Sequence, residues 1–495
     1  MTDASRRVLA ALALAALVGA GPAGAQALQK RIDTRLAAPP LNRNLWGVVL
    51  IGPDGKQLYG RNPDRMFIPA SNTKLVVSAV AAALLPPEWT VQTSVYADGP
   101  VVNGVVEGDL ILYGRGDPTM GARCYAVDTT APGVCDTDPS QRLRGLTGQL
   151  RARGVTTVAG DLIGDGSWFD GELVNGDWES YDLNWWYAAP VSGLGFNDNS
   201  IDFHYAPGPA VGAPASISFT PDFGTVAFEN RTRTVAAGQP TTIDFYREPG
   251  TLHVWAEGDV ALTSRGGTEY FALPDPDLFA GWALRAALAD SGIAVLGATG
   301  STTDSMRYHA ARQGAPLAEV SSRPVKDWIF PILNTSQNWY AEMLLKQLGR
   351  QFGGGGSWKE GLAVERRFLV DSMKVDSTQF ALRDGSGLSS SNLVSPLAFA
   401  TLLRWMHAHP RFETFAAGLP QSGQRGSLKS RFVGTPLEGL VHAKTGSISR
   451  VNTISGYIEL PGRTLTFSVE ANNHTLGSRV MLPQIDSLIV QMGKK

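Results

Sequence analysis

The feature that most constrains the fold is a serine and a lysine, Ser71 and Lys74, at the head of a long apolar run. Residues 75–85 contain no charge, no Gly and no Pro, and two prolines follow directly. A helix that is apolar on every side belongs inside a domain. If Ser71 begins this helix, Lys74 lies one turn later on the same face, so that its amine can reach the serine hydroxyl.

This pairing indicates nucleophilic chemistry. A serine hydroxyl attacks poorly unless a base removes its proton. A lysine held in an apolar site near a second cation has a lowered pKa and can act as that base. Lys444 is the candidate for the second cation. The alternative is a lysine that extends from the start of a helix into water.

Two further short pieces fit the same chemistry. Ser336 precedes Asn338 at the start of a predicted helix, and Lys444-Thr445-Gly446 lies in a predicted strand. The Ser336 hydroxyl can carry a proton toward a leaving amine; the alternative is a plain helix cap. In the strand, Lys444 can attract a carboxylate, and Gly446 allows a substrate backbone to approach. An ordinary edge-strand lysine is the alternative there.

In the rest of the chain, segments with a helical pattern of apolar residues alternate with segments that have a strand pattern. A hairpin is predicted over residues 45–61, and a β-rich region over about residues 90–320 with one helix at 277–292. Helices are predicted again at residues 336–351 and 395–409, the second with Ser395 as its N-cap. The end of the chain is predicted to form strands followed by a helix that places Ile485, Leu488, Ile489 and Met492 on one face.

Composition and the N-terminus suggest an exported protein of two or three domains. The chain has 495 residues, 43% of them hydrophobic, and its 43 Lys+Arg against 45 Asp+Glu give no basic field for nucleic acid. Two arginines, a short apolar stretch and the small residues 23–25 predict a signal peptide over residues 1–25, cleaved near Ala25-Gln26, and hence a periplasmic protein. A transmembrane anchor is the alternative, but the stretch is short for a bilayer.

The chain contains few residues suited to redox or metal chemistry, with two cysteines and seven histidines. Cys124 and Cys135 are close enough in sequence to predict a disulfide that closes a loop, with two separate thiols as the alternative. The seven histidines include no H-E-x-x-H cluster, so we expect neither a metal nor another cofactor.

The motifs together resemble the class C low-molecular-mass penicillin-binding proteins, which are D-alanyl-D-alanine carboxypeptidases and endopeptidases. The resemblance covers nearly all of the chain after the signal peptide, and 261 residues separate Lys74 from Ser336. The segments that carry it are PASNTK, GRGDPTM, NTSQNWYAEML, RDGSGLS, LPQSGQRGSLKSRF and HAKTGSI.

The resemblance implies an α+β fold with an antiparallel sheet, helices on both of its faces and a large β-rich insertion. The peptidase domain is then expected at residues 26–88 and 320–495. The insertion domain is expected at residues 89–190 and 272–319, with a second β-rich domain nested within it at residues 191–271.

It also implies roles for single residues. Ser71 is the expected nucleophile and Lys74 its base, while Ser336 and Lys444 relay protons. Asn338 and Thr445 are expected to bind substrate.

The remaining implied roles concern substrate contacts. The N–H groups of Ser71 and Ser447, beside Gly446, are expected to form an oxyanion hole. Asp165 corresponds to a family position that holds the free amine of diaminopimelate; the alternative is an ordinary turn residue. Many members carry a basic residue directly after Gly-Leu-Ser, where this chain has Ser390, so recognition of the far end of the peptide is expected to differ.

The expected partners are peptidoglycan stem peptides, their cross-links and β-lactam antibiotics. The sequence leaves open the balance of carboxypeptidase and endopeptidase action, and whether the chain is a monomer or a homodimer. The alternative function is a β-lactam-hydrolysing or non-catalytic penicillin-binding protein of the same fold. A class A β-lactamase needs a deacylating glutamate in an E-x-x-x-N context, which is absent after Asn338.

Overall fold

The computed structural model describes residues 22–121, 123, 125, 138, 140–248 and 250–494, with side chains from Gln26 onward. Most of the predicted signal peptide, together with Cys124 and Cys135, lies outside the described residues, so the leader and the disulfide stay predictions. Among the helices of the described part, none is long and apolar enough to span a membrane.

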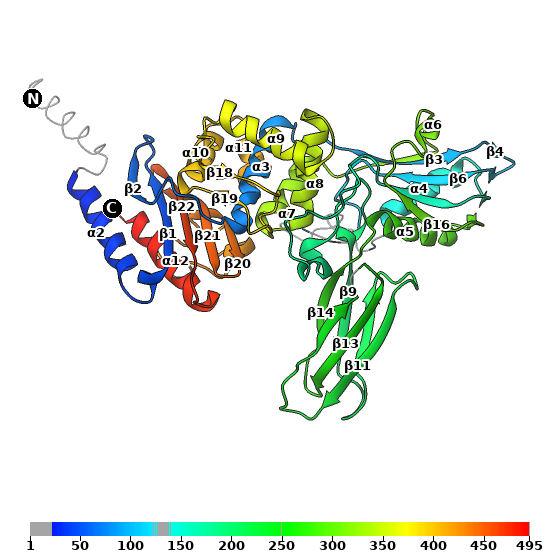
Figure 1. Cartoon of the computed structure of the whole chain (residues 1–495), viewed down its shortest axis with the longest axis horizontal. Helices are drawn as coiled ribbons and strands as arrows, with labels where there is room; N and C mark the ends of the chain where they lie inside the picture. The colour runs from blue at the N-terminus through cyan, green and yellow to red at the C-terminus, as the bar shows by residue number, and fades with distance from the viewer. Residues whose placement is uncertain are drawn as a thin grey trace, which may run out of the picture.

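A five-stranded antiparallel sheet forms the centre of the unit that carries the motifs (Figure 1). The predicted hairpin forms two of its strands, and the strand with Lys444 lies at one edge. In spatial order the strands are β2 (Gln57–Arg61), β1 (Leu45–Ile51), β22 (Arg463–Asn472), β21 (Val451–Leu460) and β20 (Val441–Ile448).

Helices cover both faces of this sheet (Figure 1). One face packs against α2 (Pro22–Ala37) and α12 (Ser478–Gly493), and the four residues predicted to share one face of the last helix are all buried there. The other face carries the remaining helices, which are α3 (Lys74–Leu84), α7 (Val325–Asn334), α8 (Asn338–Phe352), α9 (Trp358–Arg367), α10 (Pro396–His407) and α11 (Phe412–Ala416).

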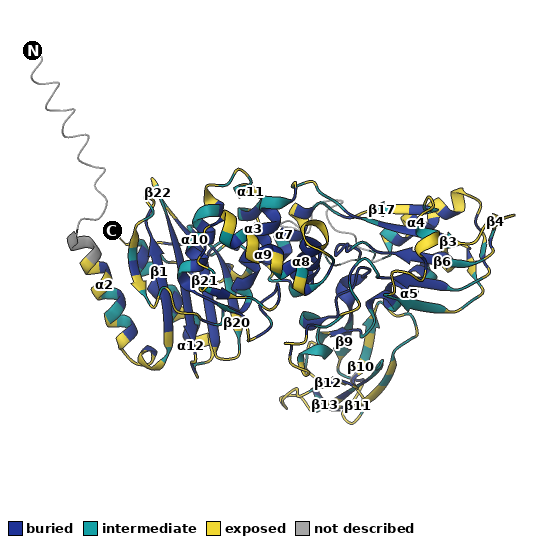
Figure 2. Cartoon of the chain, turned by 45° about the horizontal axis from the view of Figure 1, so that its top comes forward, coloured by how far each residue is buried: buried dark blue, intermediate teal, exposed yellow. Residues whose placement is uncertain are grey.

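The apolar run after Lys74 forms the middle of this helical layer. Residues Leu75 to Ala82 of α3 are all buried, and α3 packs against α7, α8, α10 and α11 (Figure 2). This is the environment that an all-apolar helix requires. Ser395 caps α10 as predicted, since its hydroxyl accepts a hydrogen bond from the N–H of Ala398.

The insertion begins at β3 (Gln92–Asp98) and returns at β17 (Ala318–Ser321), two strands that pair with each other. It contains a mixed five-stranded sheet of β16 (Thr299–Thr302), β8 (Leu162–Asp165), β6 (Asp109–Tyr113), β3 (Gln92–Asp98) and β17 (Ala318–Ser321). A small second sheet consists of β15 (Ala294–Val295), β7 (Thr157–Val158), β5 (Val105–Val106) and β4 (Val101–Val102).

Two longer helices pack on these strands, where the sequence predicted one. The predicted helix is α5 (Pro276–Asp290), and the other is α4 (Gln141–Ala152). The helix α4 was not predicted because its sequence contains two glycines and is largely polar. Its buried residues Leu143, Leu146 and Leu150 nevertheless follow a helical period. A single helical turn, α6 (His309–Arg312), and a short hairpin of β18 (Phe380–Ala381) with β19 (Leu393–Val394) complete the regular elements of these regions.

A second group of strands projects from the insertion (Figure 1). It contains one sheet of β10 (Ser216–Thr220), β9 (Ser200–Ala206) and β14 (Gly267–Ala272), and another of β11 (Ala227–Val235), β13 (His253–Ala261) and β12 (Asp244–Arg247). The predicted domain boundaries stay predictions.

Residues 166–191, which we call the bridging segment, connect the insertion to the helical layer around α3. From this segment Asp170 accepts a hydrogen bond from Lys346 of α8 at 2.8 Å, and Trp178 donates one to Asp384 at 3.0 Å. The insertion therefore contacts the same helical layer that contains Lys74.

Candidate active site

Ser71 lies in one turn of 3-10 helix, Ala70–Thr73, that leads directly into α3. The sequence predicted that the α-helix begins at the serine; instead Lys74 is its first residue. The predicted reach is present all the same, because the Lys74 Nζ lies 3.0 Å from the Ser71 Oγ.

The surroundings of Lys74 orient its amine toward the serine. Its Nζ donates to the Asn338 Oδ1 at 2.6 Å and to the backbone carbonyl of Ser386 at 2.6 Å. Both of these oxygens can only accept hydrogen bonds, whereas a hydroxyl can also donate. When the amine is neutral, its two N–H groups are therefore used by Asn338 and Ser386, and its lone pair faces the Ser71 hydroxyl.

Burial favours the neutral amine. The Lys74 side chain is fully buried, and this burial lowers its pKa to about 7, against the opposing effect of the nearby Glu342 and Asp384 carboxylates. Glu342 is itself buried beside Asp384, which raises its pKa to about 7. Near neutral pH a substantial fraction of Lys74 is thus unprotonated and able to accept a proton.

Ser336 and Lys444 form the second half of the site. The Lys444 Nζ donates to the Ser336 Oγ at 2.9 Å and to the Thr445 carbonyl at 2.7 Å. Burial lowers the pKa of Lys444 well below its usual value, and the Lys74 charge lowers it further. Ser336 is not a helix cap: it has a φ of +64°, and the side chain of Gln337 caps α8 instead.

Gly446 allows the serine turn to pack tightly against the edge strand β20. A Cβ at this position would lie 2.3 Å from the Thr453 Oγ1, 2.6 Å from the Pro69 carbonyl oxygen and 2.9 Å from the Ser71 nitrogen. The sequence analysis expected this glycine to admit a substrate backbone. A Cβ pointing from Gly446 would meet the Pro69–Ser71 turn of the chain itself, so Gly446 lets this turn lie close to β20, and the approach of a substrate backbone stays a prediction.

Two of the predicted substrate-binding residues on β20 have side chains that reach solvent. Ser447 is exposed and accepts a hydrogen bond from Asn452. Thr445 is partly exposed and donates to the Ser427 Oγ at 2.7 Å, a partner that the sequence analysis did not identify. Edge strands present unpaired backbone groups to which an extended peptide can add.

Asn338 lies at the site, but both ends of its side-chain amide already form hydrogen bonds within the protein. Its Oδ1 accepts from Lys74, and its Nδ2 donates to the carbonyl of Tyr187, in the bridging segment, at 2.7 Å. The predicted contact of Asn338 with a substrate backbone therefore requires that the amide exchange Tyr187 for the substrate.

Asp165 is placed apart from these residues. It ends β8 of the insertion with no exposed surface, and its carboxylate is paired with Arg312 of α6 and accepts a hydrogen bond from the N–H of Ser167 at 2.9 Å. Among the hydrogen bonds of the described residues, none joins it to Ser71 or to the two lysines. The predicted contact with a substrate amine requires an accessible carboxylate, so Arg312 would have to give up this contact.

The backbone that offers the Ser386 carbonyl to Lys74 is held by a residue that was not among the predicted site residues. Glu342 accepts hydrogen bonds from the backbone N–H of Gly385 at 3.0 Å and of Ser386 at 2.7 Å. Ser386 in turn offers its carbonyl to Lys74. A signal was present, since a carboxylate four residues after Asn338 lies on the same face of α8.

Comparison with known proteins identifies the family. The profile of the D-Ala-D-Ala carboxypeptidase 3 (S13) family matches residues 28–492. The chain belongs to this family. It is 33% identical over 479 residues to a D-alanyl-D-alanine carboxypeptidase of Actinomadura sp. (strain R39), covering 93% of this chain and 85% of the relative. It is 24% identical over 476 residues to penicillin-sensitive carboxypeptidase A of Dictyostelium discoideum, covering 91% of this chain and 87% of the relative.

A solved structure supports the fold of this S13 family member. Penicillin binding protein 4 from Haemophilus influenzae is similar with a TM-score of 0.79 at 22% identity, covering 94% of this chain and 99% of that protein. The predicted α+β penicillin-binding fold and the predicted enzyme class, a serine-type D-Ala-D-Ala carboxypeptidase, are both confirmed.

Proposed function

We propose that this S13 family member removes the terminal D-alanine from peptidoglycan stem peptides through an acyl-enzyme on Ser71. The observation that carries the proposal is the Lys74 amine, fully buried and 3.0 Å from the Ser71 Oγ, with both of its other contacts made to oxygens that only accept.

The first half of the reaction forms the acyl-enzyme. The neutral Lys74 takes the proton of the Ser71 hydroxyl as the oxygen attacks the carbonyl between the two D-alanines. The N–H groups of Ser71 and Ser447 stabilise the resulting oxyanion. The tetrahedral intermediate collapses by breaking the C–N bond, and Lys74 passes its proton to the departing amine through the Ser336 hydroxyl, which accepts a hydrogen bond from Lys444. Lys74 is then neutral again.

The second half releases the shortened peptide. A water molecule gives one proton to Lys74 and attacks the ester carbonyl, and Ser71 recovers its hydroxyl as the C–O bond breaks. The same acyl transfer applies to a cross-link, where the leaving amine belongs to a neighbouring peptide. A β-lactam acylates Ser71 by opening its ring, so its leaving nitrogen stays attached and the acyl-enzyme persists.

Three further assignments belong to the proposal. The substrate carboxylate is bound at β20 by Lys444 and Thr445. Asp165 contributes to the recognition of diaminopimelate only if Arg312 releases it. The chain is exported after cleavage near Ala25, since peptidoglycan lies outside the cytoplasmic membrane, and the S13 family membership supports this location.

Intact-protein mass spectrometry after exposure to benzylpenicillin tests the proposal. We expect one adduct per chain, mapped to Ser71, and none in Ser71→Ala, whose turnover should fall on the order of 10⁶-fold. Ser449→Ala is the matched control, because Ser449 is an exposed serine just beyond the motif strand. An adduct on any other serine would overturn the assignment.

A further inference from the structure

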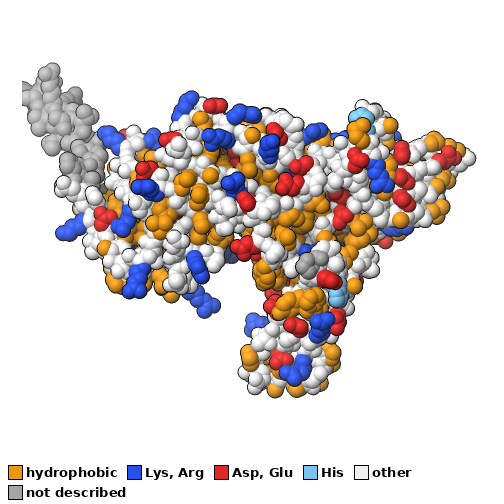
Figure 3. Space-filling model, in the orientation of Figure 1, with side chains coloured by type: hydrophobic (Ala, Val, Ile, Leu, Met, Phe, Trp, Pro, Cys, Tyr) orange, Lys and Arg blue, Asp and Glu red, His pale blue; other side chains and the backbone are white. Residues whose placement is uncertain are grey.

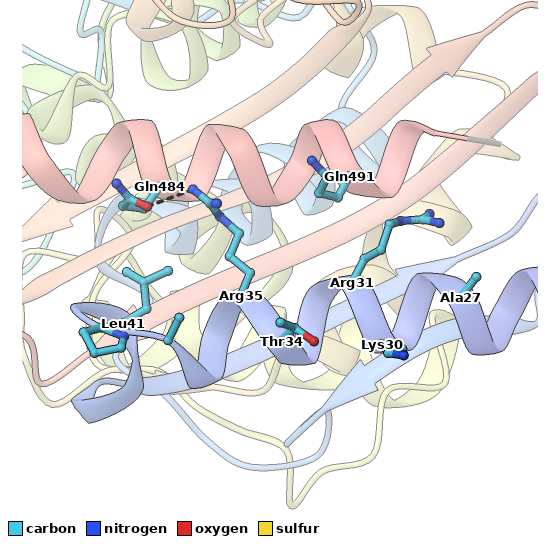
Figure 4. Close-up of a pocket in the computed structure, with 10 residues that line it drawn as sticks. Ala27, Lys30, Arg31, Thr34, Arg35, Leu41, Gln484 and Gln491 are labelled. Atoms are coloured by element: carbon cyan, nitrogen blue, oxygen red, sulfur yellow. Dashed lines mark hydrogen bonds between the residues drawn. The ribbon is translucent and has the colours of Figure 1, made fainter.

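The two helices on the face of the sheet opposite α3 enclose a groove far from the proposed active site. This α2–α12 groove has a volume of about 660 Å³, within the range of roughly 300–1,000 Å³ typical of small-molecule sites. Figure 4 shows Arg31 and Arg35 extending from α2 toward α12, and Gln484 and Gln491 on the facing helix. Lys30 also lines the groove.

The charge of this groove is uncompensated. No Asp or Glu lines it within the described part of the chain. Each helix has one acidic residue, and both are engaged elsewhere: Asp33 accepts from the Tyr59 hydroxyl at 2.6 Å, and Asp486 pairs with Arg431 at 2.5 Å. Figure 3 shows several Lys and Arg side chains on the surface around α2.

The arginines also have unused donors. The Nε atoms of Arg31 and Arg35 are shielded from solvent and have no hydrogen-bond partner among the described residues. Arg35 uses one Nη to donate to the Gln484 Oε1 at 2.8 Å, whereas the Arg31 side chain makes neither a hydrogen bond nor an ion pair in the described structure. A shielded donor without an acceptor is unfavourable and indicates a missing partner.

We propose that the α2–α12 groove binds a phosphate group. Two arginines one helical turn apart present planar forks of donors that match phosphate oxygens, and this geometry is better suited to phosphate than to a point anion. Lys30 adds a third positive charge at the exposed side, and Gln491 offers an amide donor. The residues that line the groove begin at Ala27, so cleavage at the predicted position near Ala25-Gln26 would leave all of them in the chain.

The groove has room for more than a phosphate alone, so the phosphate belongs either to a soluble phosphorylated compound or to a phospholipid headgroup. Calorimetric titration of the whole protein with sodium phosphate at low ionic strength tests whether the groove binds phosphate, the group that both kinds of ligand share. Co-sedimentation with phosphatidylglycerol vesicles, compared with phosphatidylcholine vesicles, distinguishes the two sources.

The variants Arg31→Gln and Arg35→Gln should each weaken phosphate binding roughly 10- to 100-fold, the effect of losing a hydrogen bond between charged groups. Arg479→Gln removes the same charge from an exposed position of α12 outside the groove and should change affinity less than about twofold. All three variants should keep the wild-type rate of penicillin acylation, because the groove and Ser71 lie on opposite faces of the sheet. This rate also shows that they fold.

Saturable phosphate binding that depends on Arg31 supports the proposal. If the protein also binds phosphatidylglycerol vesicles and this binding depends on Arg31, the phosphate belongs to a lipid headgroup. If the protein binds phosphate but not the vesicles, the phosphate belongs to a soluble compound. The proposal is overturned if neither phosphate nor vesicles bind, or if Arg479→Gln weakens binding as much as Arg31→Gln. Neither result bears on the acylation of Ser71.

Discussion

Replacing Gly446 by alanine tests whether the serine turn depends on its contact with β20. The new Cβ would lie 2.6 Å from the Pro69 carbonyl oxygen, and ordinary contact begins at 3.4 Å. The turn would have to move outward by roughly 0.8 Å, and a displacement of about 1 Å in a catalytic group costs on the order of 10²-fold in rate. The change also crowds the Thr453 hydroxyl, which donates to Pro69 at 2.8 Å.

We therefore expect Gly446→Ala to acylate with a fluorescent penicillin about 10²-fold more slowly while still reaching one equivalent at long times. Overpacking should lower the free energy of unfolding by about 1–3 kcal/mol, measurable by thermal denaturation. Gly355→Ala is the matched control, since a Cβ there meets nothing within 4 Å. An unchanged acylation rate in Gly446→Ala would show that β20 does not position the nucleophile.

Other predictions follow from the buried charges and from the insertion. Acylation by penicillin should increase with pH as Lys74 loses its proton, with a midpoint near its pKa of about 7. Glu342→Gln should move this midpoint to lower pH, because the negative charge that raises the pKa of Lys74 is lost, and a pH–rate profile with an unmoved midpoint would contradict this. If Arg312 releases the buried Asp165 carboxylate to the substrate amine, Asp165→Asn should reduce kcat/KM for a peptide with free diaminopimelate roughly ten- to thirtyfold, the effect of losing one hydrogen bond between charged groups, and leave penicillin acylation unchanged. Equal losses in both reactions would instead assign Asp165 a structural role. Alkylation under denaturing, non-reducing conditions should find Cys124 and Cys135 blocked in exported protein, and two reactive thiols would refute the disulfide.

The sequence by itself determined the elements whose signals are local. The apolar run after Lys74 is continuous in the chain, so its burial as α3 follows from composition alone. The three-residue spacing of Ser71 and Lys74 places both side chains on one face, because residues i and i+3 lie above each other in a turn of 3-10 helix as they nearly do in an α-helix. The order of the short motifs was enough to predict the family and the α+β fold.

Only the tertiary structure decided how the site is held together. One hydrogen bond of the Lys74 amine goes to the backbone carbonyl of Ser386, 312 residues away in the chain. Every residue has a backbone carbonyl, so the sequence does not show which one Lys74 will contact. Gly446 serves the enzyme's own serine turn, and Asp165 is buried against Arg312, because these contacts depend on how distant segments pack. Hydrogen bonds between segments hundreds of residues apart depend on how the whole chain folds. The local spacing of apolar residues predicts helices and strands, but it does not predict which distant segments meet.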